Sequence, residues 1–60
     1  MTYKILVVDD EAPVRDLFSD LFKKDGYDVK CVATGEESIE LVAKEDFDVV
    51  LMDIKLTGMS

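Results

Sequence analysis

Two short runs of strand-forming, mainly apolar residues constrain the fold of this 60-residue chain more than any other feature. They span Tyr3–Val8 and Phe47–Ile54, and both are rich in β-branched and aliphatic residues. A strand that is apolar on both sides needs cover on both sides, which is typical of a parallel sheet with helices on its two faces. The two runs therefore predict buried parallel strands in an α/β fold.

The segment after the first run has the pattern of an amphipathic helix. Pro13 suits the first turn of a helix, where its missing backbone N–H leaves no hydrogen bond unmade. Gly26 stands where helices commonly end in a left-handed residue, and two lysines that favour the negative end of the helix dipole precede it. The apolar residues between them recur at helical spacing and are Val14, Leu17, Phe18, Leu21 and Phe22.

A further strand and a shorter helix are predicted next. Residues 27–33 alternate between apolar and polar side chains, which indicates a strand more exposed than the first run. Thr34 and Glu37 have the capping-box spacing that opens a helix. The inner face of this helix is predicted to carry Ile39, Val42 and Ala43.

The resulting order is β-α-β-α-β, and the handedness of parallel crossovers restricts its layout. Crossovers are almost always right-handed, so a third strand that continued outward would put both helices on one face of the sheet. If the third strand instead lies beside the first, the helices cover opposite faces. The apolar character of both runs favours this second layout, with strand order 2-1-3, which is half of a doubly wound, flavodoxin-like parallel sheet.

Three aspartates follow or end the two apolar strands. Asp9 and Asp10 come directly after the first run, and Asp53 lies near the end of the last. In open α/β sheets the carboxyl ends of strands at a topological switch point form the ligand crevice, so these carboxylates are expected to converge. Their mutual repulsion favours a hard cation, and Mg²⁺ prefers oxygen ligands and shares them with phosphate. Two carboxylates could hold the ion while the third attacks phosphorus to form an aspartyl phosphate.

Composition and charge exclude several classes of function. The chain has 14 acidic and 7 basic residues, a net charge of -7, so direct nucleic-acid binding is not expected. It has no histidine and one cysteine, Cys31, which excludes Ser-His-Asp and Cys-His catalysis and most zinc sites. We expect Cys31 to fill core space. The longest apolar run, Ile5–Val8, is too short to span a membrane and no signal peptide precedes it, so a cytoplasmic protein without membrane contact is expected.

Three stretches of the chain carry a resemblance to a known family. They are Ile5–Glu11 (ILVVDDE), Gly35–Glu37 (GEE) and Asp48–Ile54 (DVVLMDI). On these residues the chain resembles the first half of a response-regulator receiver domain, a flavodoxin-like module of two-component signalling. The resemblance implies a phosphoacceptor rather than an enzyme. Similar domains take their phosphoryl group from a histidine kinase, a phosphotransfer protein or a small phosphodonor.

The resemblance also implies a role for each residue of the expected site. Asp53 is the expected phosphoacceptor and a ligand of Mg²⁺. Asp10 is expected to bind the ion directly and Asp9 through a water molecule. Lys55 is expected to complete the metal site with its backbone carbonyl.

Two positions and the length of the chain depart from the family pattern. Thr57 stands where receivers usually have proline, and Ser60 where they usually have aspartate or asparagine. The family fold has five strands and five helices, and the hydroxyl residue and lysine that contact the phosphoryl group come from its fourth and fifth strands. We therefore expect residues 1–60 to form a single truncated receiver domain that lacks the phosphorylation-driven switch.

Two alternative functions remain open at this point. The first is a self-associating half-domain with a vestigial site, which would form a homodimer through the outer edge of the last strand. The apolar stretch Val49–Met52 has no proline or lysine to prevent such pairing. The second is a phosphatase of the haloacid dehalogenase type, which also uses an aspartate at a strand end. That reading is less favoured, because its two acids are separated by one residue whereas Asp9 and Asp10 are adjacent.

Overall fold

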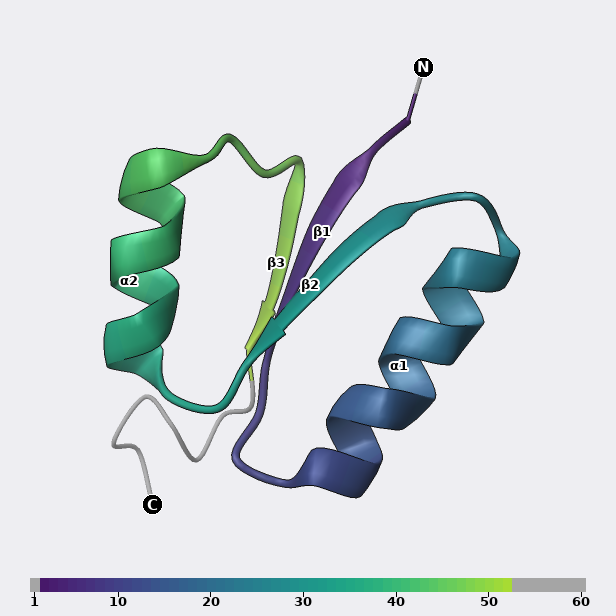
Figure 1. Cartoon of the computed structure of the whole chain (residues 1–60), viewed down its shortest axis with the longest axis horizontal. Coiled ribbons are helices and arrows are strands. Elements are labelled where there is room, and N and C mark those ends of the chain that lie inside the picture. The colour runs from purple at the N-terminus through teal and green to yellow at the C-terminus, as the bar shows by residue number, and fades with distance from the viewer. Residues whose placement is uncertain (1, 53–60) are drawn as a thin grey trace.

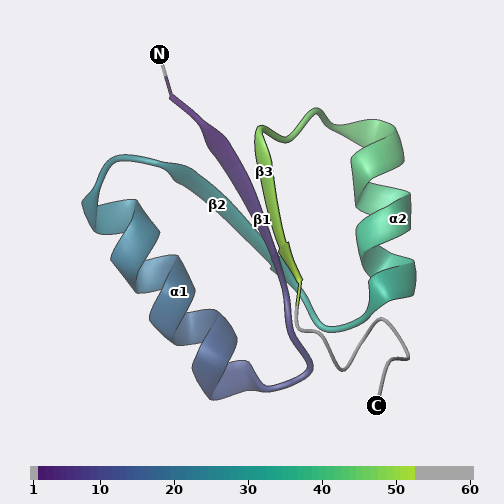
Figure 2. The same ribbon diagram turned by 180° about the vertical axis from the view of Figure 1, so that it is seen from behind.

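A three-stranded parallel sheet with a helix on either side forms the architecture of the computed structural model, which describes residues 2–52 (Figure 1). The sheet order is β2-β1-β3, and both neighbouring pairs are parallel. Figure 2 shows the two helices on opposite sides of the strands from behind. The predicted α/β class and the 2-1-3 order are therefore confirmed. The elements in chain order are β1 (Lys4–Val8), α1 (Ala12–Lys24), β2 (Asp28–Val32), α2 (Gly35–Lys44) and β3 (Val49–Met52).

The core of the described part is built around β1, the central strand. The four residues of β1 from Ile5 to Val8 are buried because neighbouring strands pair with both of its edges. Successive side chains of a strand point to opposite faces, so Ile5 and Val7 face one helix layer while Leu6 and Val8 face the other. Ile5 and Val7 form a cluster with Val29 of β2. The residues packed against this cluster are Phe18, Phe22, Tyr27 and Leu51.

The end of α1 is a Schellman motif, as the position of Gly26 predicted. Gly26 has a φ of 89° and donates its N–H to the carbonyl of Lys23 at 3.0 Å. Tyr27 donates its N–H to the carbonyl of Phe22 at 3.1 Å, which satisfies a second carbonyl of the last turn. The Tyr27 ring lies edge-on to the Phe22 ring, with centroids 6.2 Å apart. This motif turns the chain from α1 directly into β2.

Helix α2 begins as predicted but presents a different face to the sheet. The Thr34 hydroxyl oxygen accepts a hydrogen bond from the Glu37 N–H at 3.1 Å, which confirms the helix start. However, Ile39 and Val42, which the apolar pattern placed on the inner face, are 72% and 48% exposed. The predicted inner face is therefore wrong. The residue of α2 that is buried is Ser38, whose hydroxyl donates to the carbonyl of Gly35 at 2.6 Å.

Charged contacts join the C-terminal end of α2 to the sheet. Glu45, the residue after the helix, accepts hydrogen bonds from Lys4 of β1 at 3.0 Å and from Lys30 of β2 at 2.8 Å. Ser38 lies seven positions before Glu45, two helical turns away and on the same side. Ser38 and Glu45 thus both face the sheet, while Ile39 and Val42 are exposed.

Strand β3 is the more apolar of the two edge strands. It pairs with β1 in the register Ile5 to Val49 through Val8 to Met52. Val49, Val50 and Met52 are between 41% and 44% exposed, because residues 2–52 place no strand on the other side of β3. Within that same range, no helix is long and apolar enough to cross a membrane.

Candidate functional site

The predicted acidic pair lies at the carboxyl end of the central strand. Asp9 directly follows β1 and is only 9% exposed, whereas Asp10 is exposed. The loop from β1 to α1 contains only residues 9–11, so both carboxylates lie between the end of a buried strand and the start of a helix. This is the edge of the sheet at which ligands bind in open α/β folds.

Asp9 is held by three hydrogen bonds that the sequence alone did not reveal. Its N–H donates to the carbonyl of Val32 at the end of β2, at 3.1 Å. Its carboxylate oxygen Oδ1 accepts from the N–H of Glu11 at 2.9 Å, which closes a tight turn. Its carbonyl accepts from Nη1 of Arg15 at 2.7 Å. The backbone and one carboxylate oxygen of Asp9 are thus fixed, while Asp10 remains open to solvent.

Arg15 is the site residue that sequence reasoning missed. It lies in the first turn of α1, half-buried, where its side chain can reach back across the loop. The sequence signal that could have indicated its role is the position of Arg15 in the first turn of a helix that directly follows an acidic pair. That signal is weak, because an arginine at such a position is more commonly a solvated surface residue.

The other two residues of the expected site lie outside the described residues: Asp53, expected to supply a carboxylate, and Lys55, expected to supply a backbone carbonyl. Thr57 and Ser60 lie outside them as well. What the structure does give is the register between the two strands, which places Met52 beside Val8. Asp9 and Asp53 are the residues that follow these two partners in the sequence. Among residues 2–52 no group of three metal-ligating side chains occurs, and the expected trio has only two members in that range.

The donor set that the structure describes fits a hard divalent cation. Asp9 and Asp10 contribute carboxylate oxygens, which Mg²⁺ prefers over nitrogen or sulfur. The bond from Glu11 occupies Oδ1 of Asp9 and leaves Oδ2 for a water molecule of a hydrated ion. Asp10 is exposed, so a metal ion in solvent can reach its carboxylate directly. The residues present therefore fit the ion that the resemblance implies.

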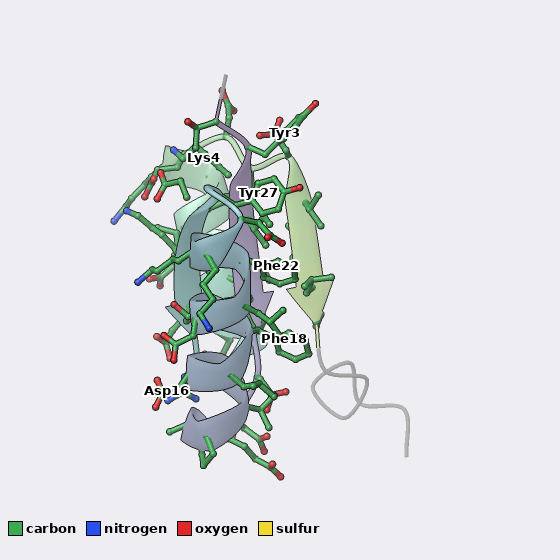
Figure 3. The ribbon with its side chains drawn as sticks, turned by 90° about the vertical axis from the view of Figure 1, so that its right-hand side faces the viewer. Tyr3, Lys4, Asp16, Phe18, Phe22 and Tyr27 are labelled. Carbon is green, nitrogen blue, oxygen red and sulfur yellow. The ribbon has the colours of Figure 1, made fainter. Side chains whose placement is uncertain are left out.

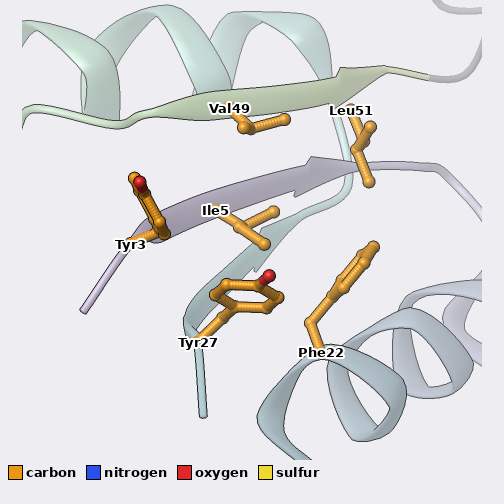
Figure 4. Close-up of a pocket in the computed structure, with 6 residues that line it drawn as sticks. All are labelled: Tyr3, Ile5, Phe22, Tyr27, Val49 and Leu51. Carbon is orange, nitrogen blue, oxygen red and sulfur yellow. The ribbon is translucent and has the colours of Figure 1, made fainter. Parts of the chain in front are cut away.

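Two hollows lie on the α1 face of the sheet, and they differ in chemistry. The smaller, of about 280 Å³, reaches the acidic end and is lined by Asp9 together with Phe18 and the ends of β1 and β3. The larger, of about 400 Å³, lies toward the amino ends of the strands and has no charged side chain in its wall (Figure 4). Its lining residues are Tyr3, Ile5, Phe22, Tyr27, Val49 and Leu51. Figure 3 shows Phe18 and Phe22 pointing from α1 toward the β3 side. The larger of these two hollows is thus the apolar one, and the smaller one contains the carboxylate of Asp9.

Two ion pairs of the described part, from Lys4 and Lys30 to Glu45, lie away from the acidic site. The hydrogen bond from Lys30, and then the one from Lys4, lower the pKa of Glu45 below the ordinary value. The hydrogen bond to Glu45 correspondingly raises the pKa of Lys30. Because these groups lie beside the amino ends of β1 and β2, they join α2 to the sheet and take no part in the acidic site.

Parallel strands in the order 2-1-3, helices on both faces and carboxylates at the carboxyl end of the central strand define the first half of a doubly wound α/β domain. A comparison with protein families gives a match to the response regulator receiver domain over residues 5–60. The match spans nearly the whole chain, and the chain belongs to this family. A comparison with solved structures gave no significant match.

Proposed function

We propose that the chain is a phosphoacceptor module in which Asp53 takes up a phosphoryl group with the help of Mg²⁺. The observation that carries the proposal is the parallel pairing of β1 with β3, in the register Val8 to Met52. Asp9 and Asp53 are the residues that follow the paired residues Val8 and Met52 in the sequence. Membership of the receiver family supports acceptor chemistry at such a strand end.

In the proposed site each acidic residue has its own task. An oxygen of Asp53 forms a bond to phosphorus while the bond between phosphorus and the donor breaks. Asp10 and the backbone carbonyl of Lys55 would hold the ion directly, and Asp9 would hold it through water. When bound there, Mg²⁺ would supply positive charge that offsets the charge on the phosphoryl oxygens. Asp9 is suited to the indirect role because its Oδ1 already accepts the Glu11 N–H.

The donor is proposed to be the phosphorylated histidine of a histidine kinase or a phosphotransfer protein, or a small phosphodonor. The chain is proposed to act as a stoichiometric acceptor and not as an enzyme, so one phosphoryl group per chain is the expected limit. Its net charge of -7 makes nucleic acid an unfavourable direct partner. We also propose a cytoplasmic location, where histidine kinases present their phosphorylated histidine.

Titration with Mg²⁺ alone tests the metal site. Amide shifts of Asp9, Asp10 and Glu11 are expected to move at millimolar Mg²⁺, because their carboxylates and loop surround the ion. The Asp53→Asn variant is expected to respond much more weakly. Incubation with acetyl phosphate and Mg²⁺ should add the mass of one phosphoryl group to the original chain and none to Asp53→Asn. A wild-type chain that shows neither response would support a vestigial site instead.

The edge of β3 that residues 2–52 leave without a neighbouring strand supports a second proposal, self-association of two chains into a homodimer. The other edge strand, β2, carries the exposed charged residues Asp28 and Lys30, which discourage pairing with another chain. Strand β3 has no charge within Val49–Met52, and three of its four side chains are exposed. Such an edge offers free backbone groups beside apolar side chains.

A second copy of the chain is the occupant that fits this edge. A two-fold axis perpendicular to the sheet pairs β3 with its own copy in antiparallel fashion, which gives the order 2-1-3-3'-1'-2'. The arrangement is closed, so each edge is used once. It also adds burial beside β3, where three of the four side chains are exposed among residues 2–52.

Sedimentation equilibrium tests the homodimer with two matched variants. Val50→Lys puts a charge into the β3 edge and is expected to shift the mass to that of one chain. Leu17→Lys makes the same kind of change at a side chain of α1 that is 59% exposed, and the dimer mass is expected to remain. A folded single chain that persists at high micromolar concentration without any substitution would refute the proposal.

A further inference from the structure

The side chain of Arg15 in α1 is hydrogen-bonded to the backbone of the acidic loop. Arg15 donates from Nη1 to the carbonyl oxygen of Asp9 over 2.7 Å, in a partly buried position. Hydrogen bonds with a charged donor are shorter and stronger than neutral ones. The bond joins the first turn of α1 to the point where β1 ends, so it spans the whole loop of residues 9–11.

We propose that Arg15 is a positioning residue that fixes the direction of Asp10 for metal binding. The inference rests on the proposed function and adds to it a residue that is not itself a ligand. The carbonyl of Asp9 and the N–H of Asp10 belong to one peptide unit, and that unit is planar. Anchoring the carbonyl therefore fixes the plane from which the Asp10 side chain starts.

The other bonds of the loop make this anchor effective. The N–H of Asp9 is held by Val32 and its Oδ1 by the N–H of Glu11. The carbonyl of Glu11 in turn accepts the N–H of Arg15 at 3.1 Å. The peptide before Asp10 is thus held by the guanidinium at its own carbonyl, while the N–H and the side chain of Asp9, on its N-terminal side, are held from β2 and from within the loop. Without the guanidinium, the carbonyl of Asp9 loses the bond that fixes the plane of this peptide.

A simpler role for Arg15 would be to offset the negative charge of the carboxylates, and the two roles predict opposite effects. A neighbouring cation repels Mg²⁺, so its removal would tighten metal binding. A positioning residue lowers the cost of ordering the loop, so its removal weakens binding. The bond to a main-chain carbonyl rather than to a carboxylate oxygen favours the positioning role.

The Arg15→Met variant tests the inference by the same Mg²⁺ titration. It keeps the length of the side chain and removes the donors and the charge. We expect its dissociation constant for Mg²⁺ to rise about tenfold, which corresponds to about 1.4 kcal/mol. Arg15→Lys restores the charge and one donor, so it is expected to recover part of the affinity. Lys24→Met removes the same charge at the exposed end of α1 and is expected to bind Mg²⁺ like the original chain.

Hydrogen exchange of the Glu11 amide gives a second readout that needs no metal. This N–H is bonded to Oδ1 of Asp9, so its protection reports the order of the loop. Faster exchange is expected in Arg15→Met, partial protection in Arg15→Lys and unchanged exchange in Lys24→Met. Exchange at Leu6 in the core is expected to stay slow, which separates loop disorder from unfolding.

The outcomes distinguish this inference from the proposed function. If the original chain does not respond to Mg²⁺, the metal proposal fails, and Glu11 exchange alone decides whether Arg15 orders the loop. If the original chain responds but Arg15→Met binds Mg²⁺ equally or more tightly, the positioning role is overturned while the metal site stands. Unchanged Glu11 exchange in both Arg15 variants would overturn it as well.

Discussion

Replacing Gly26 with alanine is the most direct test of how this chain turns from α1 into β2. Gly26 has a φ of 89°, and a Cβ added there would have no other atom within 4 Å. The cost of Gly26→Ala is therefore conformational and not steric. A left-handed conformation costs an L-residue about 1–2 kcal/mol. The reduced freedom of alanine in the unfolded chain offsets about 0.4–1 kcal/mol of this. A net loss of about 1 kcal/mol in the free energy of unfolding is expected.

Urea denaturation followed by circular dichroism measures this loss, and thermal unfolding provides a check. For a chain of 60 residues, 1 kcal/mol corresponds to a fall of about 8 °C in Tm. Gly26→Asn is the matched control, because asparagine tolerates the left-handed region better than alanine, and a smaller loss is expected. If Gly26→Ala unfolds at the same urea concentration as the original chain, the Schellman motif does not contribute to stability and the reasoning is wrong.

Three further predictions concern the sheet and α2. The pKa of Glu45 is lower in the folded than in the unfolded chain. The contacts of Glu45 therefore stabilise the fold fully at pH values above the ordinary carboxyl pKa, and this stabilisation is lost as the pH falls through the lowered pKa of the folded chain. Glu45→Gln is therefore expected to lower the urea midpoint more at pH 7 than at pH 3, with Glu40→Gln as the control; an equal loss at both pH values would contradict this. Leu6 is 0% exposed, so Leu6→Ala is expected to lower the free energy of unfolding by about 2–5 kcal/mol and to abolish cooperative unfolding. A thermal transition that is retained in this variant would show that neighbouring side chains fill the space. The hydroxyl of Ser38 donates to a carbonyl of its own helix, and alanine is a better helix former than serine. Ser38→Ala is therefore expected to raise the free energy of unfolding by up to about 0.5 kcal/mol in the same urea assay. A clear loss of stability would indicate that this hydroxyl supports the packing of α2.

The elements and their ends were predictable because their signals are local. Gly26 ends α1 and Thr34 begins α2 through contacts with residues at most four positions away. The strand order followed from the handedness of the crossovers and from the apolar character of the first and last runs. The position of Asp9 and Asp10 at the end of β1 followed from the same reasoning.

Side-chain burial on the outer elements was less predictable. Cys31 was expected in the core, but it is exposed, with its thiol 3.8 Å from the carbonyl of Arg15. It lies in β2, an edge strand, and an edge strand is covered less completely than the central one. The exposure of Ile39 follows from the orientation of α2, which turns Ser38 and not Ile39 toward the sheet.

The sequence by itself determined which segments become strands and helices, how α1 ends and α2 begins, and that Asp9 and Asp10 lie at the carboxyl end of the central strand. These properties depend on periodicity and on backbone preferences within a few residues. The tertiary structure decided the rotation of α2, in which Ser38 is buried and Glu45 pairs with Lys4 and Lys30. It also decided the anchoring of Asp9 by Arg15, six residues away along the chain. Such contacts depend on how separate elements meet in space, and no repeating pattern along the chain encodes that meeting.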